Sequence, residues 1–147
     1  MFKNVLIPTD GSALARKAVK AGVALAKELG AKVVAYYAIE TVQPYLYADG
    51  YVLDTSTFKN FEEQAREVGR KYLAEVEKSA KSVGVECEML MTKPATAYQG
   101  IIDAAKKKRC DAIFMASHGR GELASLILGS VTQKVLAHSK IPVIVYR

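Results

Sequence analysis

Cysteine and long apolar runs are both scarce in this sequence. Its two cysteines, Cys87 and Cys110, lie far apart and form no CxxC or CxxH pair, so the sequence offers neither a zinc cluster nor a dense disulfide framework. No apolar stretch is long enough to cross a bilayer, and the first residues lack the charged start, apolar run and cleavage site of a secretory signal. We therefore expect a cytoplasmic protein with no membrane partner.

The sequence also lacks a linker, and its 147 residues are close to the commonest size of one domain. Hydrophobic residues make up 50% of the chain and charged residues 24%, a balance that is typical of a folded protein and argues against disorder. The formal net charge of +6 attracts polyanions in general but names no partner. We expect a single domain over residues 1–147, and nucleotide binding, nucleic-acid binding and simple solubility stay open on charge alone.

Five short apolar segments have the pattern of buried strands, at residues 5–8, 33–39, 85–91, 112–116 and 141–146. Helical spacing of apolar residues fills the four intervals between them, over residues 14–29, 58–83 and 98–105 and from Ser130 onward. Ser12 is the predicted N-cap of the first helix and Gly30 its stop. The positions predicted to face the core are Leu14, Ala18, Ala21, Leu25 and Leu29 in the first helix, Phe58, Phe61, Ala65, Val68, Tyr72, Val76, Ala80 and Val83 in the second, and Val131, Val135 and Leu136 in the fourth.

This strict alternation predicts a doubly wound α/β fold, with one parallel five-stranded sheet and helices on both of its faces. Ligands bind such sheets beyond the carboxyl ends of the strands, where the strand order reverses. Candidate site residues should therefore follow the strands, and two segments qualify, residues 8–12 and 115–119. Residues 40–57 form the only long connection, which suits a lid or a partner surface.

The residues from Ala116 to Val131 combine glycines, a hydroxyl group and a cation. Gly119 and Gly129 let a ligand approach the backbone closely, and Ser130 opens a helix, where backbone N–H groups point outward. The helix dipole and Arg120 would both favour a phosphate. The residues alone thus predict an anion site, and the alternative, in which Gly119 and Gly121 only shape a turn and Ser130 only caps a helix, stays open.

These residues resemble the ATP motif of the universal stress protein family, in which a Gly is followed after two residues by a second Gly and after nine more by Gly and Ser or Thr. Here Gly119 and Gly129 have that nine-residue spacing, Ser130 follows, and Ala116 replaces the first glycine. The resemblance to nucleotide-binding members extends from the opening strand to the last one. The added methyl group of Ala116 would lie close to ribose and phosphate, where it can weaken binding.

The resemblance implies a Rossmann-like sheet of strand order 3-2-1-4-5 and a site for ATP or AMP, with Mg²⁺ as a companion of the phosphates. It implies an adenine side at Pro8, Asp10 and Ala38, a ribose side at Met115 and Ala116, and a phosphate side at Gly119, Gly129, Ser130 and Val131. We add their neighbours Thr9, His118 and Arg120 as ligand contacts. We predict no catalytic residue and no metal ligand.

Two functions follow from the resemblance. In the first, the protein binds ATP or AMP and acts as a stress-linked sensor or regulator without being an enzyme. In the second, Ala116 has disabled nucleotide binding and the protein is a dimeric interaction module. The retained Gly119, Gly129 and Ser130 favour the first. An enzyme that consumes nucleotide would need a general base and a metal-holding carboxylate beside the phosphates, and only Asp10 is placed near them.

The sequence also bears on macromolecular partners. The basic run at residues 106–109 ends a predicted helix, where cations complement the dipole and stay solvated, so we do not expect a nucleic-acid partner. The last strand, from Ile141 to Tyr146, would lie at an edge of the sheet with β-branched side chains that need cover. We therefore expect a homodimer formed by two-fold pairing of these strands.

Overall fold

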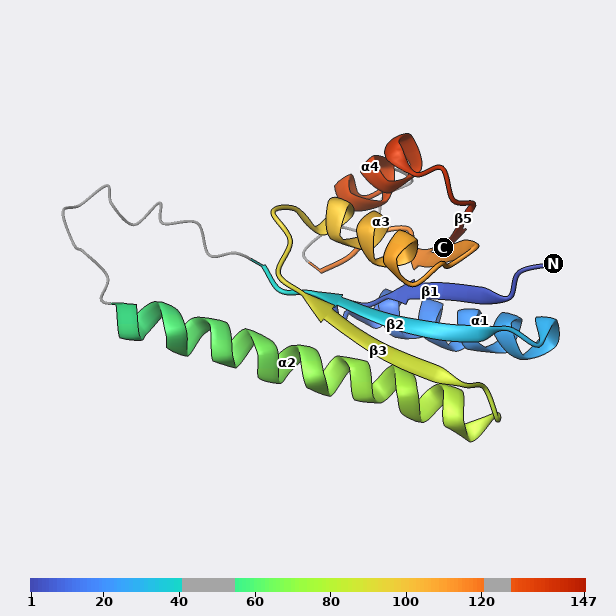
Figure 1. Ribbon diagram of the computed structural model, residues 1–147, viewed down its shortest axis with the longest axis horizontal. Coiled ribbons are helices and arrows are strands. Elements are labelled where there is room, and N and C mark those ends of the chain that lie inside the picture. Colours follow the sequence, from blue (N-terminus) through green and yellow to red (C-terminus); the bar gives the residue numbers. More distant parts are fainter. Residues whose placement is uncertain (41–54, 121–127) are drawn as a thin grey trace.

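The computed structural model describes residues 1–40, 55–120 and 128–147. Its helices and strands alternate along the chain as predicted (Figure 1). They are β1 (Asn4–Pro8), α1 (Ala13–Leu29), β2 (Lys32–Ala38), α2 (Thr55–Ser82), β3 (Cys87–Thr92), α3 (Ala97–Lys107), β4 (Ala112–Ala116), α4 (Ser130–His138) and β5 (Val143–Tyr146). Most of the predicted lid, residues 41–54, and residues 121–127 of the predicted phosphate segment lie outside the described residues.

The five strands form one sheet of order β3-β2-β1-β4-β5 in which every pair is parallel, as predicted. From β1 the chain adds β2 and β3 on one side, and then crosses to β4 and β5 on the other. The strand order therefore reverses between β1 and β4. The carboxyl ends of these two strands flank the position at which such sheets bind ligands.

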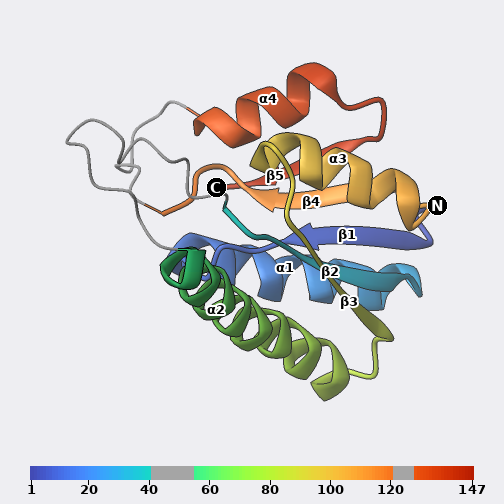
Figure 2. The same cartoon turned by 60° about the vertical axis from the view of Figure 1, so that its left-hand side comes forward.

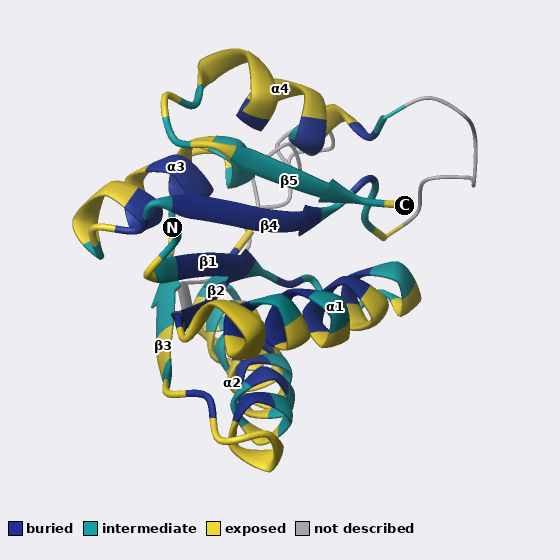
Figure 3. Ribbon diagram, turned by 90° about the vertical axis from the view of Figure 1, so that its right-hand side faces the viewer, coloured by how far each residue is buried: buried dark blue, intermediate teal, exposed yellow. Residues whose placement is uncertain are grey.

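The helices cover both faces of the sheet, with α1 and α2 on one side and α3 and α4 on the other (Figure 2). Alternate residues of β1 enter different cores: Val5 and Ile7 pack with α1 and α2, whereas Leu6 packs with α3 and α4. Figure 3 shows β1 and β4 as the buried centre of the sheet. Among the described residues, no helix is both long enough and apolar enough to span a membrane.

The ends of α1 are as predicted and so is part of its buried face, since Ala18 is buried and Ala21 and Leu25 pack half-buried against the core. Ser12 Oγ accepts the Ala15 N–H at 3.2 Å, and Gly30 ends the helix in the left-handed region at φ 63°. Small side chains occupy much of the buried face, whose residues are Ala15, Ala18, Val19, Gly22, Val23 and Ala26. A Cβ atom at Gly22 would lie 2.8 Å from Ile7 Cδ1. Because the helix lies so close to the sheet, the predicted leucines flank the contact, and Leu29 is 36% exposed.

The predicted core stripe of α2 is correct at Val76 and Ala80, but Val83 is 37% exposed and lies beyond the end of the helix, and the buried Leu73 was not predicted. Leu73, Val76 and Ala80 are buried, whereas Phe61 is 46% and Val68 is 40% exposed. Figure 1 shows that the first turns of α2 run past the ends of the strands, so the sheet does not cover them. Val68 is exposed for another reason, because the buried Gly69 beside it is the residue that faces Tyr37 and Met91. Apolar spacing alone does not reveal where a sheet ends.

Helix α4 begins at Ser130 as predicted, but Leu136 is 41% exposed and its predicted inward position is wrong. The inward face is made by Thr132 and Val135, which are both buried. Thr132 Oγ1 donates a hydrogen bond to the Ala116 carbonyl at 3.0 Å. This bond turns Thr132 toward the end of β4, so Leu136 lies on a part of the helix surface that is exposed.

Two predicted strand starts were too early by two residues. The Val85 N–H donates to the Ala80 carbonyl at 2.9 Å, so Val85 belongs to the turn that follows α2, and β3 starts at Cys87. The Ile141 N–H donates to Ser139 Oγ at 3.0 Å, which makes a turn before β5. In both places the backbone N–H group makes a local hydrogen bond and is not available to pair with a neighbouring strand.

The bond between Thr132 and Ala116 gives a stability prediction. Thr132→Val keeps the shape of the side chain but removes the donor to a part-buried carbonyl, so we expect the free energy of unfolding to fall by about 1–3 kcal/mol. Urea denaturation followed by circular dichroism measures the change. Thr132→Ser keeps the hydroxyl group and should lose less, and a Thr132→Val protein as stable as wild type would contradict this role.

Candidate functional site

A cavity of about 500 Å³ lies at the carboxyl edge of the sheet, around the ends of β1, β2 and β4 and the start of α4. All twelve ligand-contact residues predicted from the sequence line it, although they come from separate segments of the chain. They are Pro8, Thr9, Asp10, Ala38, Met115, Ala116, His118, Gly119, Arg120, Gly129, Ser130 and Val131. The structure therefore brings the predicted adenine, ribose and phosphate residues into one space.

Eight further residues line the cavity and were not predicted: Ala15, Tyr36, Tyr37, Glu40, Ala65, Ala97, Ile101 and Thr132. Tyr37 and Glu40 lie at or just beyond the end of β2, so the rule that ligands bind beyond strand ends would have found them. Ala65 and Ala97 belong to α2 and α3. No local sequence pattern marks these two helix residues, because their place depends on how the helices pack.

The loop after β1 is held by a backbone hydrogen bond to β2 and by hydrogen bonds to its own side chains. The Thr9 N–H donates to the Tyr36 carbonyl at 2.9 Å, and Thr9 Oγ1 accepts the Gly11 N–H at 3.2 Å. Asp10 Oδ1 accepts the Ser12 N–H at 2.9 Å. These bonds fix the Asp10 carboxylate at the start of α1.

The same carboxylate joins this loop to the loop after β4. Asp10 Oδ2 accepts the Arg120 N–H at 2.7 Å, and a Cβ atom at Gly119 would lie only 2.5 Å from that oxygen. A side chain at Gly119 would therefore displace Asp10. The resemblance implied Asp10 on the adenine side and Gly119 on the phosphate side, and in the structure the two are in contact.

Arg120 links the two loops to α2. Its Nη2 donates to the Asp10 carbonyl at 3.2 Å and to Tyr72 Oη at 2.5 Å. The Tyr72 ring lies where a side chain on Gly11 would have to go, and Gly11 has φ 75°. The hydrogen bond to Tyr72 raises the pKa of Arg120 above its usual value. The sequence placed Tyr72 in the core stripe of α2 and missed this contact.

The start of α4 forms the third side of the site. The Gly129 N–H donates to the Ser117 carbonyl at 2.8 Å, which fixes the start of the helix beside the end of β4. Gly129 has φ −61° and ψ 155°, a conformation open to any residue. The first turn of α4 borders the cavity, so its backbone N–H groups and dipole provide a favourable place for an anion.

The described residues do not form a cage for a metal ion. They contain no group of three His, Cys, Asp or Glu side chains close enough to hold one. Both Asp10 oxygens already accept backbone N–H groups. His118 Nδ1 lies 3.1 Å from Ser117 Oγ, within hydrogen-bond distance of that hydroxyl group.

Known proteins resemble the chain over its whole length. A relative from Methanocaldococcus jannaschii, universal stress protein MJ0531, is 34% identical over 100% of this chain and 83% of its own length. The solved structure of MJ0577, a universal stress protein from the same organism, has a TM-score of 0.84 and 25% identity, covering 99% of this chain and 95% of that one. A universal stress protein solved in complex with cAMP has a TM-score of 0.73 and 21% identity, covering 99% and 97%, which shows a shared fold.

The family-level match agrees with these individual relatives. It extends over residues 1–147, and the strand order and the two helical layers described above are the fold that these structures share. The chain belongs to the universal stress protein family.

Proposed function

We propose that the protein binds an adenine nucleotide, AMP or ATP, in the cavity at the carboxyl edge of the sheet. In this proposal it is a cytoplasmic, stress-linked sensor or regulator and not an enzyme. The observation that carries the proposal is that all twelve residues predicted as nucleotide contacts line one cavity. The family to which the chain belongs, and the cAMP bound by a protein of the same fold, support it.

The lining suits the parts of a nucleotide. A volume of about 500 Å³ is within the range of sites for small ligands. Pro8, Ala38, Ile101 and Met115 supply apolar surface for a base. The first turn of α4 would receive a phosphate. Because the described residues offer no cage for a metal, Mg²⁺ would arrive with the phosphates of ATP.

The proposal has a direct test and a defined competitor. Purified protein is denatured and any released nucleotide is identified by mass spectrometry, and protein freed of nucleotide is titrated with AMP and with ATP plus Mg²⁺ in a calorimeter. Binding supports the sensor. If neither ligand produces heat and no nucleotide is released, the protein is instead the dimeric interaction module.

Gly129 tests the place of the phosphate. Its φ and ψ accept a side chain, so Gly129→Ala should fold normally while its methyl group obstructs a ligand at the start of α4. We expect a fall in affinity for AMP of about tenfold, which corresponds to ~1.4 kcal/mol. Calorimetry gives the affinity and thermal unfolding confirms the fold. Unchanged affinity in the folded variant would remove Gly129 from the site.

Ala116 tests the departure from the family motif. It is half-buried at the end of β4 and lines the cavity, so its methyl group crowds a ligand that lies against the strand end. Ala116→Gly should tighten ATP binding by roughly 1–3 kcal/mol, the usual gain when overpacking is relieved. Calorimetry with ATP and Mg²⁺ measures the change. A weaker complex would contradict the steric argument.

We also propose a homodimer through β5. This strand is at the end of the sheet, pairs with β4 on one side, and has four half-buried residues. Val143 packs against the α3 and α4 core, whereas Ile144 and Tyr146 pack against the α1 and α2 core. Val145 belongs to neither core, so it is the apolar side chain of β5 most in need of cover from a second copy.

Val145→Asp tests the dimer without disturbing either core. A carboxylate buried in the pairing surface should dissociate the dimer, which sedimentation equilibrium detects as a change to monomer mass at micromolar concentration. Val83→Asp is the matched control, because Val83 is also partly exposed but lies after α2. A wild-type monomer, or a Val145→Asp dimer of undiminished affinity, would refute pairing through β5.

A further inference from the structure

The cavity has little positive charge for a site that is to receive phosphates. Four of its described lining residues have ionisable acidic or basic side chains: Asp10, Glu40, His118 and Arg120. With His118 counted as neutral at pH 7, two carboxylates face one guanidinium group, which leaves one net negative charge. The chain as a whole carries +6, so the cavity has the opposite sign.

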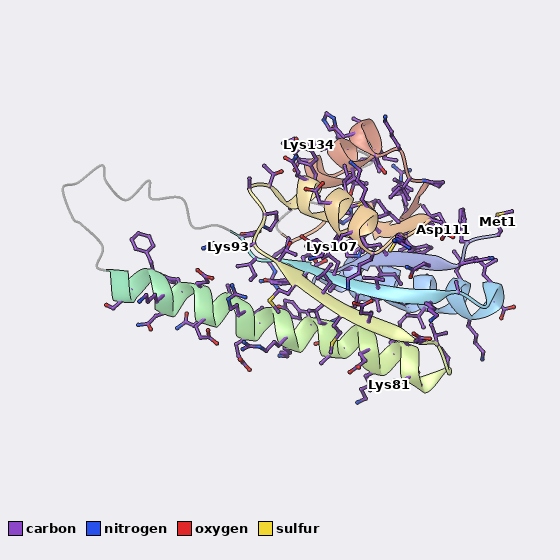
Figure 4. The ribbon with its side chains drawn as sticks, in the orientation of Figure 1. Met1, Lys81, Lys93, Lys107, Asp111 and Lys134 are labelled. Carbon is purple, nitrogen blue, oxygen red and sulfur yellow. The ribbon has the colours of Figure 1, made fainter. Side chains whose placement is uncertain are left out.

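Three cations in the described part of the chain, Lys93, Arg66 and Lys134, belong to segments around the cavity but have partners outside it. Residues 41–54 and 121–127 contain no lysine, arginine or histidine. Lys93, after β3, lies 2.8 Å from Glu62, and Arg66 lies 2.9 Å from the same carboxylate. Lys134 on α4, labelled in Figure 4, lies 5.6 Å from the centre of the Tyr98 ring. Each of these cations already has another partner.

Asp10 and Arg120 limit the space for a chain of phosphates. The Arg120 guanidinium is bound to Tyr72 Oη and to the Asp10 carbonyl. The Asp10 carboxylate occupies the Arg120 N–H and lies against Gly119. A phosphate that extends from the start of α4 toward Gly119 therefore meets a carboxylate instead of free N–H groups. The most favourable position for a phosphate is the start of α4, where the helix dipole corresponds to about half a unit of positive charge.

We propose, on the basis of the nucleotide-binding function above, that the site selects adenine nucleotides with a single phosphate group and accepts ATP only together with a divalent cation. One phosphate lies at the first turn of α4 and avoids Asp10. The two further phosphates of ATP bring negative charge toward the half-buried Asp10 carboxylate, and the exposed Glu40 adds a weaker repulsion that solvent screens. A divalent cation on the phosphates cancels it.

Calorimetry on the full chain tests this order of affinities among the adenine nucleotides. AMP, cyclic AMP and ATP are each titrated in EDTA, and ATP is titrated again with Mg²⁺. We expect AMP and cyclic AMP to bind at least about tenfold more tightly than ATP in EDTA, and Mg²⁺ to remove most of that difference. Comparison of AMP with cyclic AMP shows whether the monoester or the diester is preferred. ATP in EDTA binding as tightly as AMP would overturn the proposal.

Charge variants test the cause. Glu40→Gln removes a carboxylate from the cavity and should raise the affinity for ATP in EDTA, relative to AMP, by a factor of about two or more. Asp10→Asn should also raise the affinity for ATP relative to AMP, and by a larger factor. The single amide oxygen of Asn can replace only one of the two carboxylate oxygens that accept the Ser12 and Arg120 N–H groups. Glu28→Gln makes the same change in net charge on the last turn of α1, away from the cavity, and should leave the ratio unchanged.

The outcomes separate this inference from the proposed function. If no nucleotide binds wild-type protein, the nucleotide-binding function fails and the preference fails with it. If all three nucleotides bind and neither Glu40→Gln nor Asp10→Asn alters the ratio of ATP to AMP affinity, the function stands and the charge argument is wrong. A ratio that shifts in these two variants but not in Glu28→Gln supports both.

Discussion

The Asp10 carboxylate holds together the two loops from which the cavity is built. One oxygen accepts the Ser12 N–H at the start of α1, and the other accepts the Arg120 N–H beyond β4. These loops follow the two strands between which the sheet order reverses. The parallel sheet brings the strand ends together, and a charge-assisted bond across the gap then fixes the distance between the loops. The absence of a side chain at Gly119 is a condition for that bond.

The second constraint is the close packing of α1 on the sheet. Gly22 lies against Ile7 and Phe114, so α1 can approach β1 and β4 closely only because that position has no side chain. The helix axis in turn fixes Ser12, whose hydroxyl group caps it, and Asp10 two residues earlier. The geometry of the site therefore depends on small residues in the core as well as on polar residues in the loops.

The sequence predicts the fold from local signals, and it predicts the lining of the cavity from strand ends together with the family resemblance. Ser12 and Gly30 bound α1 as predicted, and residues at or after strand ends, such as Met115 and Asp10, line the cavity. The failures concern long-range geometry. Phe61 has core spacing but is 46% exposed, Val68 has it too but the adjacent Gly69 takes the inward position, and Tyr72 has it but binds Arg120. The helical spacing of apolar residues does not distinguish a tyrosine in the core from one whose hydroxyl group binds a residue 48 positions away in the chain.

Ser117 connects the cavity with the edge of the sheet through one residue. Its carbonyl accepts the N–H of Gly129 at the start of α4, while its own N–H donates to the carbonyl of Tyr146 at the end of β5, each at 2.8 Å. Ser117 is buried, so neither bond has water as an easy substitute. A ligand that moves the start of α4 therefore acts on the same residue that fixes the end of β5. The regulator proposed above would need a path of this kind from its ligand to its surface, and this path is two hydrogen bonds long.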